Sequence, residues 1–223
     1  MSSKIRNNLE RADWRFIREA CCATGNGGAP IDRARWPFFA EQWIGPYERL
    51  RPEWAYVAEE ASPTRERGPN SRAGYLTGCP DSARFRAERR WLFDIPLFVQ
   101  ARLGLFPMNG DVARFLTRIR AEFTGKIPGR GPEESFPADT TREVLTEYPA
   151  HLHMNLTGEA RGNGIGRALV ERYREDLTHA GVHGIHLFCG EGPRLFYQRV
   201  GFRIIDQIEF RPGIVVYRLG SRF

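Results

Sequence analysis

The residues Arg161-Gly162-Asn163-Gly164-Ile165-Gly166-Arg167-Ala168 lie between a predicted strand at 150–157 and a predicted helix at 165–180. The glycines permit left-handed backbone angles and let a ligand approach the backbone closely. The first turn of the helix presents unpaired N–H groups, with the positive end of the helix dipole behind them. Arg161 and Arg167 add formal positive charge. The run predicts an anion site suited to phosphate. A plain strand-to-helix turn, with glycines used for packing, is the alternative.

Two other phosphate-binding motifs fit this run poorly. The dinucleotide fingerprint G-x-G-x-x-G needs its third glycine one position after Gly166, and it needs more sheet than the about 60 residues that follow can supply. A P-loop needs Gly-Lys-Ser/Thr, and the run contains no lysine. Both motifs are therefore weak matches.

Strands and helices alternate on both sides of the run. After it, we expect strands at 184–189, 202–205 and 214–219 and a short helix at 193–200. This order is α/β and closes with an antiparallel pair of strands. Before it, we expect helices at 13–22, 32–43, 82–103 and 111–123 and an antiparallel pair of strands at 54–58 and 73–77. Asp13 and Asp111 are expected to cap helices, and Pro46 is expected to end the helix at 32–43.

Composition indicates one globular domain. The 223 residues suffice for one core, so we expect a single domain over 1–223, with a helical, Pro- and Gly-rich insertion at about 96–147. No stretch approaches the ~18 apolar residues of a membrane helix. The net charge of +6 comes from scattered arginines, which indicates a solvated surface, so we expect no nucleic-acid or membrane partner. Oligomeric state stays open. The chain has four cysteines, Cys21, Cys22, Cys79 and Cys189, and none of them forms a C-x-x-C pair. This pattern predicts a reducing, cytoplasmic location.

Two segments of the last third resemble the GNAT acetyltransferases. The run from Arg161 to Gly166 resembles the R/Q-x-x-G-x-G/A motif of that family, and Leu195-Phe196-Tyr197-Gln198-Arg199-Val200-Gly201-Phe202 resembles its F-Y-x-x-x-G-F signature. The resemblance implies an α/β fold with a mixed, twisted sheet, split in a V and flanked by helices. It implies acetyl-CoA in the split, with its pyrophosphate on the glycine loop and its pantetheine arm along the strand before it. The implied binding residues are Met154, Asn155, Leu156, Arg161, Gly162, Asn163, Gly164, Ile165, Gly166, Arg167 and Tyr197.

A narrower resemblance extends the likeness to most of the chain, excluding residues 96–147. It rests on residues 23–28, 45–47, 54–60, 74–82 and 148–153. These segments look like bacterial GNAT proteins related to the C-terminal acetyltransferase-like domain of O-GlcNAcase. The implied function is an acetyl-CoA-dependent enzyme that transfers acetyl directly to the amine of an unidentified small molecule or peptide. The alternative is an acyl-CoA-binding module with little or no turnover, suggested by Gly190, where many GNAT proteins carry asparagine.

Acetyl transfer needs a base for the amine and a proton donor for the leaving thiolate. By resemblance Tyr197 is the donor, with a core aromatic as the alternative. His151 and His153 lie two apart on one strand and share a face, so each is a candidate base or a satisfied polar group. Asp81 is another candidate base, or a helix cap. No third ligand accompanies the two histidines at motif spacing, so we expect no metal.

Overall fold

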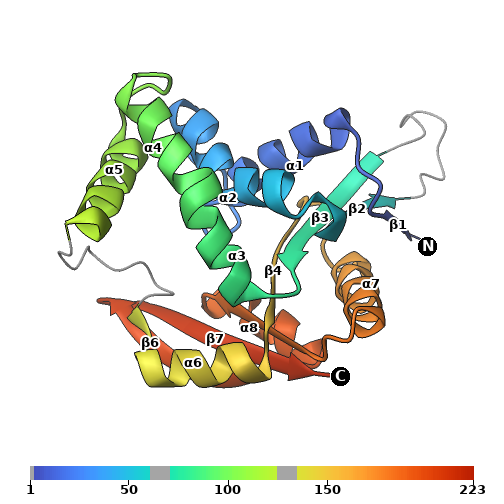
Figure 1. Ribbon diagram of the computed structural model, residues 1–223. Helices are drawn as coiled ribbons and strands as arrows, with labels where there is room; N and C mark the ends of the chain where they lie inside the picture. Colours follow the sequence, from blue (N-terminus) through green and yellow to red (C-terminus); the bar gives the residue numbers. More distant parts are fainter. Residues whose placement is uncertain (1–2, 61–70, 125–134) are drawn as a thin grey trace.

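One mixed sheet organises the chain, for which a computed structural model describes residues 3–60, 71–124 and 135–223 (Figure 1). Its strand order is β1-β2-β3-β4-β5-β7-β6, with β4 and β5 parallel and the other neighbours antiparallel. The described strands are β1 (Ser3–Arg6), β2 (Ala55–Glu60), β3 (Ser71–Cys79), β4 (Ala150–Leu156), β5 (Gly184–Cys189), β6 (Arg203–Arg211) and β7 (Ile214–Arg222). The mixed α/β architecture confirms the predicted fold class.

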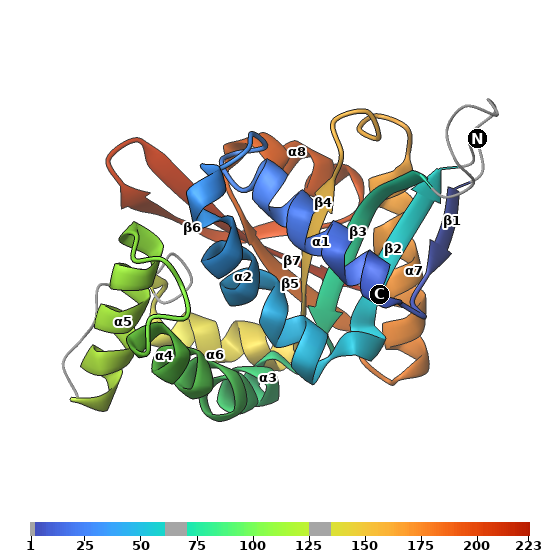
Figure 2. The same cartoon turned by 90° about the horizontal axis from the view of Figure 1, so that it is seen from above.

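Helices cover both faces of this sheet (Figures 1 and 2). α1 (Arg11–Thr24) and α2 (Trp36–Leu50) lie against one face of β3 and β4. α7 (Ile165–His179) and α8 (Glu191–Arg199) contribute to the main core cluster on the other face. The remaining α-helices are α3 (Ser82–Arg89), α4 (Ile95–Arg102), α5 (Gly110–Phe123) and α6 (Ala138–Glu147), and a π-helical segment, η3 (Arg90–Asp94), joins α3 to α4.

The sheet opens between its two parallel strands. β4 and β5 pair at only two positions, Ala150 with Ile185 and His151 with His186. Beyond His151, β4 continues to pair with β3 but no longer with β5. Residues 152–156 therefore form one edge of a split, which is the V-shaped opening that the sequence predicted.

The prediction that Pro46 ends its helix is wrong, because α2 continues through Pro46 to Leu50. Proline has no N–H, so the carbonyl of Gln42 loses its usual helical partner. Arg89 supplies a replacement, since its guanidinium donates a hydrogen bond of 3.3 Å to the Gln42 carbonyl. A contact from another helix thus compensates the break that the local sequence predicts.

The predicted caps of two helices are also wrong. Glu10 is the N-cap of α1, and Asp13 lies one turn inside it, where it is buried and paired with Arg6. Asn109 is the N-cap of α5, because its side chain accepts hydrogen bonds from the backbone N–H groups of Asp111 and Val112. Asp13 nevertheless takes part in the capping box of α1, because its carboxylate accepts a hydrogen bond of 2.8 Å from the Glu10 N–H. It also pairs with Arg6, and Asp111 pairs with Arg35.

Most of the predicted insertion is helical. α4 and α5 pack against Phe38 of α2 in a core cluster of their own, apart from the sheet. Residues 125–134, the Pro- and Gly-rich part of the insertion, lie outside the described residues. No described helix is long and apolar enough to cross a membrane. All four cysteines are free thiols, and three of them are buried, as the sequence predicted.

Candidate functional site

The glycine loop has the geometry of an anion site. Gly162 and Gly164 adopt positive φ angles of 85° and 78°, and a Cβ atom added at either position would meet nothing within 4 Å. These two glycines therefore serve the backbone conformation and not packing. Gly164 is the N-cap of α7 without a side-chain cap, so the first N–H groups of the helix stay available to a ligand.

Gly166 has a different role. A Cβ atom there would lie 2.9 Å from the Phe196 ring and 3.3 Å from Leu156. The residue lets α7 approach both α8 and the end of β4. The packing alternative therefore holds for the third glycine of the run and not for the first two.

The arginines of the loop join neighbouring segments. Arg161 donates a hydrogen bond of 3.4 Å to the Gly28 carbonyl, which brings the turn after α1 beside the loop. Arg167 donates to the Arg199 carbonyl at 3.1 Å and pairs with Glu171 at 3.6 Å. Both side chains remain exposed, so their charges stand near the helix terminus where an anion would bind.

Strand β4 presents two unlike faces at the split. Leu152, Met154 and Leu156 pack into the core cluster with α7 and α8. His153 faces the opposite way, toward α1 and α2. The Thr157 N–H donates to the Ala73 carbonyl on the β3 side. Because backbone groups alternate along a strand, those of Met154 and Leu156 point toward the open edge.

Tyr197 lies on the α8 side of the split. Its ring is edge-on to Phe196 and Phe202, and the side chain is buried in the same cluster as Met154. Its hydroxyl makes no hydrogen bond to a described residue. Burial, and to a lesser degree the neighbouring Cys189 thiol, raises the pKa of Tyr197, so it is protonated at neutral pH.

His153 occupies the other side of β4 and is held by hydrogen bonds. Its Nε2 lies 3.1 Å from the Tyr75 hydroxyl and 3.2 Å from the Asn155 amide nitrogen. The Trp43 ring stacks on its imidazole with centroids 6.3 Å apart. Burial lowers the pKa of His153 to about 4, which makes it a neutral imidazole at pH 7.

His151 lies in a more enclosed polar cluster. Its Nδ1 is 2.7 Å from the Ser82 hydroxyl, and its Nε2 is 2.9 Å from the Tyr47 hydroxyl. Burial is the main cause that lowers the pKa of His151 well below its usual value, and the nearby His186 adds to it. Both histidines therefore face the α2 side of β4, and each has hydrogen-bond partners there.

Asp81 is exposed and caps α3, because its carboxylate accepts a hydrogen bond of 2.9 Å from the Arg84 N–H. This is the capping alternative that the sequence left open. The structure thus brings His153 and Tyr197 to opposite faces of the same split and places Asp81 at the start of α3. Sequence reasoning missed Trp43 and Tyr75, which hold His153, because a single aromatic residue gives no motif.

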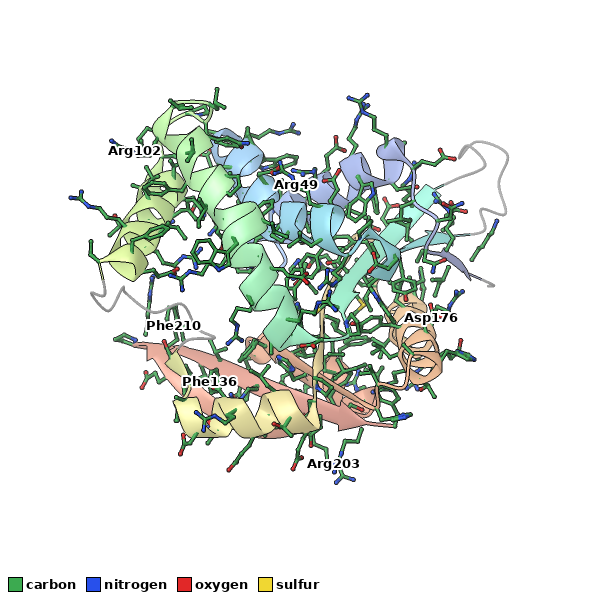
Figure 3. The ribbon with its side chains drawn as sticks, in the orientation of Figure 1. Arg49, Arg102, Phe136, Asp176, Arg203 and Phe210 are labelled. Carbon is green, nitrogen blue, oxygen red and sulfur yellow. The ribbon has the colours of Figure 1, made fainter. Side chains whose placement is uncertain are left out.

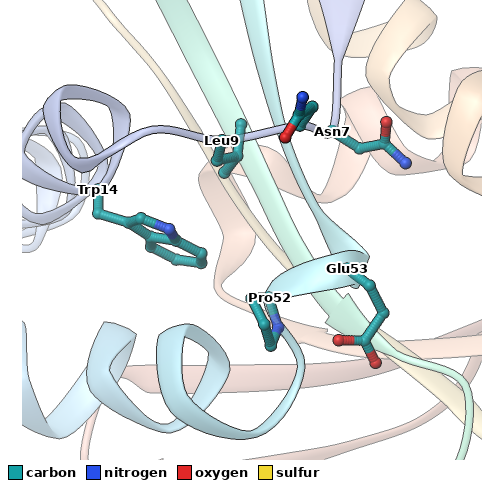
Figure 4. A pocket seen from close by; sticks show the side chains of 6 residues that line it. Asn7, Leu9, Trp14, Pro52 and Glu53 are labelled. Atoms are coloured by element: carbon teal, nitrogen blue, oxygen red, sulfur yellow. The ribbon is translucent and has the colours of Figure 1, made fainter.

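Two of the surface hollows formed by the described residues lie beside α1. One, of about 470 Å³, lies beside the end of β4 between α1 and the start of α2, with Phe16, Glu19, Arg33, Trp36 and Thr157 in its wall. The other, of about 410 Å³, is lined by Asn7, Asn8, Leu9, Trp14, Pro52 and Glu53 (Figure 4). The described residues contain no group of three or more His, Cys, Asp or Glu side chains that could hold a metal ion.

Comparison with known proteins agrees with this architecture. No protein-family model matches the chain. The solved structure of SsHAT is 26% identical, with a TM-score of 0.69, over 100% of this chain and 98% of that one. Ard1 from Thermoplasma volcanium is 10% identical, with a TM-score of 0.54, over 100% and 98%. A GCN5-related N-acetyltransferase from Kribbella flavida is 15% identical, with a TM-score of 0.51, over 99% and 98%. The chain therefore has the fold of the GNAT acetyltransferases.

Proposed function

We propose that this protein is an acetyl-CoA-dependent N-acetyltransferase that transfers the acetyl group directly to an amine. The observation that carries the proposal is the split between β4 and β5, bordered by a free helix terminus on one side and by Tyr197 on another. The narrower likeness to bacterial relatives of the O-GlcNAcase domain belongs to this proposal. So does a cytoplasmic location, which four free thiols support.

The chain offers a place for each part of acetyl-CoA. The first N–H groups of α7, at Ile165, Gly166 and Arg167, suit the pyrophosphate, and the exposed side chains of Arg161 and Arg167 add positive charge. The open backbone edge at Met154 and Leu156 suits the amide groups of the pantetheine arm, which would extend the sheet as a strand does. When bound, the thioester supplies the acetyl group.

Tyr197 suits the role of proton donor. The amine nitrogen bonds to the acetyl carbon, the carbon–sulfur bond breaks, and the sulfur takes a proton to leave as a thiol. A phenol whose pKa burial raises stays protonated until that moment. Since its hydroxyl has no hydrogen bond to a described residue, it is free to donate to the sulfur.

Replacing Tyr197 with Phe tests this role. We expect Tyr197→Phe to lower kcat by about 10²-fold, the usual loss for a general acid, while calorimetry shows the same affinity for acetyl-CoA. Tyr56→Phe is the matched control, because Tyr56 is buried but its hydroxyl donates a hydrogen bond to Asp176. Figure 3 labels Asp176 on α7. A Tyr197→Phe variant with kcat unchanged would remove Tyr197 from the mechanism, and binding without turnover in the unaltered protein would favour the acyl-CoA-binding module.

A further inference from the structure

Trp43 is an exposed aromatic side chain beside the point where the sheet opens. Its side chain is 41% exposed, although neighbouring Ile44 and Tyr47 on the same helix are buried. Its ring lies nearly parallel to the His153 ring, at 21°, and Phe39 flanks it at 6.0 Å. His153 is two residues beyond His151, the last residue of β4 that pairs with β5. A molecule that approaches the split from the α1–α2 side therefore meets Trp43.

The nitrogen of His153 that faces its neighbours already has a partner. The Asn155 amide donates to the Tyr75 hydroxyl at 2.8 Å, and His153 Nε2 lies 3.1 Å from the same hydroxyl and 3.2 Å from the Asn155 amide nitrogen. Nε2 is thus already within hydrogen-bond distance of two neighbours, and burial lowers the pKa of the ring to about 4. His153 is poorly suited to remove a proton from an ammonium group.

Among the described residues, no acidic side chain contacts His153. The side chains that contact His153 come from α1, α2, β3 and β4, and none is acidic: Cys21, Trp43, Tyr75 and Asn155. Two carboxylates of α2, Glu41 and Glu48, form ion pairs with Arg18. Burial alone lowers the pKa of His153, without a contribution from a charged neighbour. A protonated alkylamine would therefore find no ion-pair partner among the side chains that contact His153.

We propose that the acceptor is a primary amine attached directly to a planar aromatic ring, which stacks on Trp43. The inference rests on the proposed acetyltransferase function. An arylamine is unprotonated at neutral pH because its lone pair is delocalised into the ring, whereas an alkylamine is protonated like lysine, with a pKa of about 10.4. The neutral nitrogen bonds to the acetyl carbon, the thiolate takes the proton of Tyr197, and the surplus proton on nitrogen passes to water. Solvent then returns a proton to Tyr197, so the products are the N-aryl acetamide and CoA.

Two isomeric amines, p-toluidine and benzylamine, test the proposal. They match in size but differ in whether the nitrogen is on the ring. With the unaltered protein and acetyl-CoA at pH 7, and with the uncatalysed rate subtracted, we expect CoA release with p-toluidine at least about tenfold faster. Between pH 6 and 8 the p-toluidine rate should stay flat, while the benzylamine rate should rise roughly tenfold per pH unit as its neutral fraction grows.

Trp43→Ala supplies the second readout. We expect it to raise the KM for p-toluidine roughly tenfold and to leave the affinity for acetyl-CoA unchanged in calorimetry. Trp91→Ala is the control, because Trp91 is 63% exposed and lies in the η3 segment. Faster acetylation of benzylamine, a normal KM in Trp43→Ala, or acetyl-CoA binding without acetylation of either amine would each overturn the proposed acceptor. Failure of a folded protein to bind acetyl-CoA would instead overturn the proposed function itself.

Discussion

Asp13 shows how a single buried charge can join three elements. Its carboxylate is fully buried and accepts hydrogen bonds of 2.6 and 2.7 Å from Arg6 and another of 2.7 Å from Arg72. The backbone N–H of Glu10 donates to it as well. Burial on its own raises the pKa of Asp13, but these hydrogen bonds outweigh it and bring the pKa to about 2. Asp13 therefore links the start of α1 to β1 and β3.

This shift predicts an acid-sensitive contribution to stability. A carboxylate whose pKa is lower in the folded state stabilises the fold above its unfolded pKa, about 3.9, and loses that contribution as the pH falls toward 2. We expect Asp13→Asn to lower the free energy of unfolding by about 2 kcal/mol at pH 7. Urea unfolding of both proteins at several pH values would measure this loss of stability.

The difference in free energy of unfolding between Asp13→Asn and the unaltered protein should decrease below pH 4. Glu175→Gln, at an exposed carboxylate of α7, should change stability little at any pH. A constant difference between Asp13→Asn and the unaltered protein from pH 7 to pH 2 would contradict this account.

At the scale of elements, local pattern predicted most strands and helices. β2 and β5 are short, largely apolar runs, and the apolar residues of α7 repeat at helical spacing, so their positions could be predicted from the sequence. β1 was missed because its four residues, Ser3–Arg6, include only one apolar side chain. α6 was missed because Val144 is the one buried residue in its ten. Such elements depend on partners far along the chain, which a local pattern does not contain.

Gly184 and Gly192 give a paired prediction at this scale. A Cβ atom at Gly184, the first residue of β5, would lie 2.2 Å from the Glu147 carbonyl oxygen, a backbone atom that cannot turn aside. A Cβ atom at Gly192, within α8, would meet nothing within 4 Å. We expect Gly184→Ala to destabilise the fold by about 1–3 kcal/mol, and Gly192→Ala to change its stability by less than about 1 kcal/mol, since the helix propensity of alanine is opposed by the ring of the following Pro193.

Denaturant unfolding of both variants measures these changes. Equal stabilities for Gly184→Ala and the unaltered protein would mean that the α6–β4 connection does not press on the start of β5. The same result would be evidence against the described position of β4 and β5 relative to each other.

At the scale of the whole molecule, the glycine run and its flanking elements were predicted, whereas the contacts across the sheet were not. The run fixed the type of loop because glycine spacing acts locally. The surroundings of His153 could not be predicted, because Trp43, Tyr75 and Asn155 come from three separate elements. The same holds for Arg89, whose contact with Gln42 lets α2 continue through a proline.

A calorimetric titration with acetyl-CoA tests the central claim most directly. We predict micromolar binding by the unaltered protein and a loss of at least about tenfold in Gly164→Asp, which places a negative charge at the terminus of α7. Gly104→Asp is the matched control, since Gly104 has a similar φ of 77° and equally open surroundings outside the split. A folded protein that does not bind acetyl-CoA, or equal affinities in the two variants, would contradict the assignment of this loop and split as the acetyl-CoA site.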